Sequence, residues 1–121
     1  MSGGLYYQGA IVKVQLDIGI GSEINGKIRP CIVLAVPTKQ EGRHSGESGL
    51  VIIVPLTSTD LKFWTVVRIK KRTGLDNESY ALCHQIRSIS SERIVEKSGK
   101  IDPYTFKIIH MTVGRMLSNR M

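Results

Sequence analysis

The chain contains the segment PCIVLAV at residues 30–36 and the segment GLVIIVPL at residues 49–56. Both are continuous runs of apolar and β-branched residues of strand length, closed by proline or glycine. Such a run predicts a central strand that is buried on both faces. We therefore expect two neighbouring core strands, joined by a polar connection over residues 38–48 that holds two glycines and several charges.

A shorter strand pattern precedes these two runs. Residues 10–16 alternate apolar and polar side chains after Ile11, as a strand with one buried face does. The following residues, 17–27, carry three glycines together with serine, glutamate and asparagine. This composition predicts a long exposed loop that leads directly into the first core strand.

Three further strands are expected after the second core run. Residues 65–70 and 79–86 show strand patterns joined by a turn-like stretch, and residues 89–95 predict a short edge strand. In the segment 79–86, alternation would place His84 on one face and Gln85 on the other.

The chain then predicts one terminal helix. Asp102 is a favourable N-cap and Pro103 suits the first helical turn. Apolar residues follow at helical spacing, namely Phe106, Ile109, Val113, Met116 and Leu117. Short strands with tight connections and a single terminal helix indicate a mainly β fold, a small antiparallel barrel with a C-terminal α-helix. We expect residues 1–121 to form one domain, with residues 1–7 flexible.

The formal net charge of +7 favours phosphate-bearing partners, so nucleic acid is the leading ligand class. Cys31 and Cys83 lie far apart, with no pair of cysteines at zinc-ligand spacing, and no structural metal or cofactor is expected. The sequence shows neither a secretory signal pattern nor an apolar run long enough to span a bilayer. We expect a cytoplasmic protein.

Two places at strand ends carry residues suited to phosphate chemistry. Arg29 stands where the polar loop meets the first core strand, and a guanidinium held there can stabilise charge that develops during phosphoryl transfer. Thr57 and Ser58 follow the second core strand after Pro55, which is expected to limit further pairing. Taken alone, these residues also fit a surface salt bridge and a local hydroxyl-bonded turn.

His84 is a candidate general acid or base because the ordinary pKa of histidine lies near neutrality; the alternative is a hydrogen-bonded structural histidine. The interval 62–72 combines five basic residues with Phe63 and Trp64, and Tyr80 follows. Cations and aromatic faces suit unpaired RNA bases, but the same pattern also fits a solvated edge strand.

The motifs that carry a family resemblance occur in a fixed order: Gly21-Ser22-Glu23, Lys27-Ile28-Arg29-Pro30, Pro55-Leu56-Thr57-Ser58, Gly74-Leu75-Asp76 and Gln85-Ile86-Arg87-Ser88-Ile89. This set closely resembles the MazF/PemK toxin family over about residues 8–117. The resemblance implies the CcdB/MazF fold, which is an SH3-like barrel with a C-terminal helix. It also implies a homodimer and a cognate antitoxin whose acidic C-terminal segment occupies the RNA groove.

For this chain the resemblance implies a type II toxin that cuts single-stranded RNA without a metal, leaving 2′,3′-cyclic phosphate and 5′-hydroxyl ends. Arg29 and Thr57 would be the catalytic pair. The residues expected to line the RNA groove are Ser22, Glu23, Asn25, Lys27, Ser58, Gln85 and Arg87. Some relatives carry an acidic residue where this chain has His84, so the general base is left open.

Two other functions remain compatible with the sequence. One is a non-catalytic gyrase inhibitor resembling the CcdB toxins, although the C-terminal residues 116–121 lack the Trp-Gly end associated with that group. The other is an RNA-binding barrel without catalysis, which would bind RNA and leave it intact.

Overall fold

The computed structural model describes residues 7–16, 28–38, 48–71, 75 and 77–118. These residues form one seven-stranded sheet, two short 3₁₀ helices and one α-helix. In chain order the elements are β1 (Ala10–Gln15), β2 (Ile28–Ala35), β3 (Leu50–Thr57), β4 (Val66–Ile69), β5 (Ser79–Leu82), η1 (Cys83–Gln85), β6 (Arg87–Ser90), η2 (Ser91–Arg93), β7 (Ile94–Lys100) and α1 (Pro103–Ser118).

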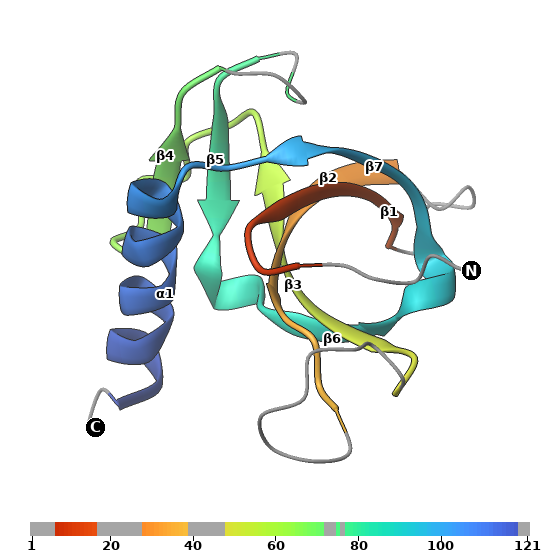
Figure 1. Cartoon of the computed structure of the whole chain (residues 1–121). Coiled ribbons are helices and arrows are strands. Elements are labelled where there is room, and N and C mark those ends of the chain that lie inside the picture. Colours follow the sequence, from red (N-terminus) through yellow and green to blue (C-terminus); the bar gives the residue numbers. More distant parts are fainter. Residues whose placement is uncertain (1–6, 17–27, 39–47, 72–74, 76, 119–121) are drawn as a thin grey trace, which may run out of the picture.

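Strand β3 is central to the sheet. It pairs with β2 along one edge, and along the other with β6 near its start and β5 near its end. The strand order is β4-β5-β3-β2-β1-β7, and each pairing is antiparallel. In Figure 1 the strands β1, β2, β3, β6 and β7 curl into a barrel-like shape, while β4 and β5 lie beside α1. The predicted mainly β fold with a C-terminal helix is confirmed.

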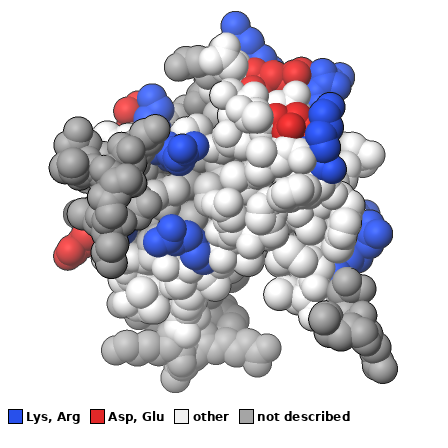
Figure 2. Space-filling model, turned by 180° about the vertical axis from the view of Figure 1, so that it is seen from behind, with Lys and Arg blue, Asp and Glu red and all other residues white. Residues whose placement is uncertain are grey.

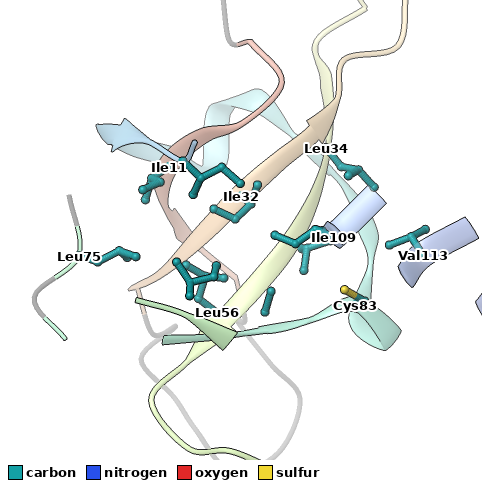
Figure 3. Packing of buried hydrophobic residues seen from close by; sticks show 12 residues of the cluster. Ile11, Ile32, Leu34, Leu56, Leu75, Cys83, Ile109 and Val113 are labelled. Carbon is teal, nitrogen blue, oxygen red and sulfur yellow. The ribbon is translucent and has the colours of Figure 1, made fainter. Parts of the chain in front are cut away.

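Both faces of β2 and β3 are covered, which explains why their sequences are continuously apolar. Alternate side chains from these strands belong to two different buried clusters. The cluster enclosed by the curled strands includes Val12, Val14, Cys31, Val33, Val51, Ile53 and Ile89. The cluster between the sheet and α1 includes Ile11, Ile32, Leu34, Val54, Leu56, Leu75, Ile109 and Val113. Figure 3 shows side chains of this cluster, drawn from the strands and from α1.

Helix α1 begins where the sequence predicts. The Asp102 carboxylate accepts hydrogen bonds from the backbone N–H and the hydroxyl of Thr105, at 2.9 and 2.8 Å. An N-cap of this kind stabilises a helix by about 1 kcal/mol. Ile109 and Val113 are buried, whereas Leu117, expected on the same face, is 71% exposed. Leu117 lies in the last turn, which extends past β4 and β5, the strands beside the helix (Figure 1).

The predicted strand over residues 79–86 is wrong in its second half. β5 ends at Leu82, and the chain turns through η1 before β6 begins. The turn is needed because β5 pairs with the end of β3 and β6 with its start, on the same edge. Pro55, which has no N–H for a ladder, lies in the gap between these pairings. β3 nevertheless continues beyond Pro55 to Thr57, contrary to expectation.

The third predicted strand of this region, at residues 89–95, has different bounds in the structure, which has two strands there. Residues 87–90 form β6, and the longer β7 pairs with β1 through two register shifts. Of the segment expected to be flexible, only Tyr7 lies within the described residues; its backbone carbonyl accepts a hydrogen bond from the Ala10 N–H. None of the described helices is long and apolar enough to cross a membrane.

Candidate active site

A pocket of about 510 Å³ opens where the ends of β1, β2 and β3 meet the chain leading into β5. Its lining residues are Lys13, Ile28, Arg29, Pro30, Leu56, Thr57, Ser58, Leu75, Asn77 and Ser79. Leu56 and Leu75 are buried and belong to the apolar cluster under α1. Arg29, Thr57 and Ser58 line the same opening as these two buried leucines.

The strand register explains why Arg29 and Thr57 come together. Cys31 of β2 lies opposite Pro55 of β3. Counting two residues outward along each strand aligns Arg29 with Thr57, on the same face of the sheet as that pair. Facing side chains on antiparallel neighbours begin about 5 Å apart, so one phosphate group can contact both.

The Thr57 hydroxyl is oriented by the backbone that follows it. Its oxygen accepts a hydrogen bond from the N–H of Thr59 at 3.3 Å. Because that contact uses a lone pair and not the hydroxyl hydrogen, Thr57 can still donate to a ligand. Ser58 is exposed beside it. The local turn considered from sequence is therefore present, and it orients the donor at the pocket.

Arg29 is half-buried on β2. No carboxylate in the described ranges forms an ion pair with it. Its positive charge and that of Arg87 both favour the thiolate of Cys31, so the two cations lie near the same buried cysteine. A half-buried guanidinium without a carboxylate partner among these residues is well suited to bind an anion.

Both cysteines are buried and free. Burial raises the pKa of Cys31 to about 12, outweighing the opposing effect of Arg29 and Arg87, and raises that of Cys83 to about 11. Thiols with such pKa values are poor nucleophiles at neutral pH. Within the described segments, no three His, Cys, Asp or Glu residues are grouped so as to hold a metal ion.

His84 does not line the pocket. It lies in η1, where Nδ1 is 2.9 Å from the Thr65 hydroxyl and the ring packs edge-on against Phe63 at 5.3 Å. Gln85 and Arg87 are exposed and are also outside the lining. Their expected roles stay predictions, as does that of His84.

Four of the predicted RNA-binding residues, Ser22, Glu23, Asn25 and Lys27, lie outside the described residues. Lys13, Asn77 and Ser79 line the pocket and were not singled out from the sequence. The sequence does contain a signal for Lys13, because a charged residue within an alternating strand lies on the face that is not fully buried. The position of Asn77 depends on how the chain before β5 folds back, which local patterns do not reveal.

The basic and aromatic interval 62–72 contains side chains that have partners within the protein. Arg68 pairs with Glu78, Lys62 with Asp60, and the Arg115 guanidinium lies 5.3 Å from the centre of the Trp64 ring. On the face shown in Figure 2, acidic and basic side chains adjoin at the upper edge. Nearer the middle, basic side chains stand apart from acidic ones on a mostly uncharged surface.

Comparison with known proteins gives consistent results. The sequence profile of the PemK-like, MazF-like toxins of type II toxin-antitoxin systems matches residues 7–117. Endoribonuclease MazF9 of Mycobacterium tuberculosis is 32% identical over 96 residues, which cover 78% of this chain and 80% of that protein.

Solved structures share the fold. MazF of Deinococcus radiodurans superposes with a TM-score of 0.72 at 19% identity, covering 95% of this chain and 98% of that one. A mycobacterial endoribonuclease, solved in complex with its cognate antitoxin, gives a TM-score of 0.69 at 18% identity, covering 94% of this chain and 96% of that one.

Proposed function

Since the chain belongs to the PemK-like, MazF-like toxins of type II toxin-antitoxin systems and is an endoribonuclease, we propose that it cuts single-stranded RNA sequence-selectively and without a metal, using Arg29 and Thr57. The observation that carries this proposal is the pocket in which the two side chains line one opening. Two groups that recognise phosphate, on neighbouring strand ends at one opening, suit electrostatic stabilisation of a transition state.

The reaction we propose uses the RNA's own nucleophile. The 2′-oxygen of one nucleotide attacks the adjacent phosphorus, the bond from phosphorus to the 5′-oxygen breaks, and the products carry a 2′,3′-cyclic phosphate and a 5′-hydroxyl. Arg29 neutralises charge that builds on the non-bridging oxygens, while the Thr57 hydroxyl donates a hydrogen bond to one of them.

Protons must also move, from the 2′-hydroxyl to a base and from an acid to the departing 5′-oxygen. His84 stays a candidate for one of these steps. Its Nδ1 is engaged with Thr65, which fixes the ring and leaves Nε2 for exchange. The residues proposed to bind the RNA on either side of the cut are Ser22, Glu23, Asn25, Lys27, Ser58, Gln85 and Arg87.

The partners we propose are a second copy of this chain and a cognate antitoxin with an acidic C-terminal segment, in the cytoplasm. A solved relative of the same fold is bound to its cognate antitoxin. The net charge of +7 is complementary to an acidic segment, which would compete with RNA for the same cations.

The experiment that tests this function compares RNA and DNA in the absence of metal. Purified protein is incubated in EDTA with a long single-stranded RNA and with DNA of matching sequence. We expect discrete RNA cuts bearing cyclic-phosphate ends and intact DNA, because DNA lacks the 2′-hydroxyl. RNA left intact over several sequences would contradict the proposal and favour the gyrase-inhibitor or binding-only alternative.

A further inference from the structure

The pocket continues beyond Arg29 and Thr57 to Lys13 and Asn77, which the proposed chemistry does not use. Its volume of about 510 Å³ lies in the range of pockets that enclose whole small ligands, not just a phosphate. The lining also includes apolar side chains, among them Pro30, Leu56 and Leu75. The opening therefore combines further polar groups with apolar side chains against which a flat ring can lie.

Lys13 supplies a second positive charge to this space. It lies on β1, directly opposite Pro30 of β2. Its ammonium is 3.9 Å from a Glu96 carboxylate oxygen, and the two side chains are 40% and 58% exposed. An ion pair this long and this exposed contributes little stability, so a phosphate can replace Glu96 at low cost. A lysine ammonium suits this role because it binds phosphate as a point charge.

Asn77 offers a different kind of contact. Its backbone carbonyl accepts a hydrogen bond from the Ser79 hydroxyl at 3.2 Å, and the residue is exposed at the pocket. No partner of its side-chain amide is found among the described residues. An amide carries both a donor and an acceptor, which is the combination that the edge of a nucleobase presents.

We propose that Lys13 and Asn77 form a nucleotide subsite next to the scissile phosphate. Lys13 binds the phosphate of the neighbouring nucleotide, Asn77 hydrogen-bonds its base, and the base lies against Leu75 and Pro30. The subsite rests on the function proposed above. Beyond that function, the proposal states which residues bind the neighbouring nucleotide and select its base.

The Lys13 contact is tested with Lys13→Gln, Lys13→Arg and, as a matched control on α1, Lys107→Gln. In the glutamine variant we expect KM for RNA to rise about tenfold with kcat nearly unchanged. Binding is measured over a salt series with RNA that carries one 2′-deoxynucleotide at the mapped cut. The slope of log affinity against log salt should fall in magnitude by about 0.7, as for one lost phosphate contact. Lys13→Arg and Lys107→Gln should keep the wild-type slope.

The Asn77 contact is tested by sequencing the cut sites that Asn77→Ala makes in a random RNA pool, with Asn77→Ser as a second, less disruptive variant. We expect the base preference at a single position beside the cut to weaken about tenfold, while other positions keep theirs. Thermal unfolding of each variant shows whether the fold is intact.

The outcomes distinguish failure of the subsite from failure of the RNA-cleaving function on which it rests. If the wild-type protein cuts RNA and the folded variants match it in KM, salt slope and base preference, the subsite is wrong and the function stands. A loss confined to kcat in both variants also overturns the subsite. If the wild-type protein cuts no RNA, the function fails and the subsite with it.

Discussion

Replacement of Arg29 by alanine is expected to lower kcat for RNA cleavage by about a hundredfold to a thousandfold, with a much smaller change in KM. The reason is that charge develops on the phosphate oxygens mainly in the transition state, so the guanidinium contributes more there than in the bound ground state. Arg29→Lys keeps the charge but loses the planar fork, and it should retain a small part of the activity.

The measurement is single-turnover cleavage of one defined RNA, with cut products quantified over time. Arg68→Ala is a matched control, because it removes the same kind of side chain from an exposed edge strand where Glu78 pairs with it. Activity of Arg29→Ala within about threefold of the wild type would mean that Arg29 is not in the active site.

Replacement of Ile109 by alanine is expected to lower the free energy of unfolding by about 2–5 kcal/mol. Ile109 is completely buried and connects α1 to the sheet through the cluster that also holds Leu56 and Leu75 (Figure 3). Truncation removes apolar contacts and leaves a cavity that the rigid strands cannot fill. Because these leucines line the pocket, RNA affinity should weaken as well.

Urea unfolding at one fixed protein concentration measures this loss, since association would otherwise shift the apparent stability. Lys107→Ala, exposed on the same helix, serves as the control and should change the unfolding free energy by less than about 0.5 kcal/mol. A loss below about 1 kcal/mol for Ile109→Ala would show that α1 is not held to the sheet by this cluster.

The core of the fold could be predicted because its signals are local. The unbroken apolar runs of β2 and β3 indicate strands that are covered on both faces, and Asp102-Pro103 gives the start of α1. The turn at η1 could not be predicted from the 79–86 pattern, because it arises from the demand that β3 pair with two strands along one edge. β7 is mostly polar and partly exposed, so its sequence gives only a weak strand signal.

The residues of the candidate site also fall into two groups: those that local sequence patterns reveal, and those that only the fold brings to the pocket. Arg29 and Thr57 can be identified from the sequence because reactive residue types stand directly at the ends of core strands, and the family motifs include both. Lys13 and Asn77 join them only through strand register and chain closure, which no local pattern contains. Residue type makes His84 a candidate, yet its surroundings in η1 are set by Thr65 and Phe63.

The central claim is that this chain cuts RNA with the RNA's own 2′-hydroxyl. It is tested most directly by single-turnover cleavage, in EDTA, of an RNA in which only the nucleotide preceding the mapped cut carries a 2′-deoxyribose. We predict unchanged binding and no cut at that position, with cyclic-phosphate ends on the unmodified RNA. Cleavage at the deoxynucleotide would contradict the account, because the attacking oxygen would then have to come from elsewhere.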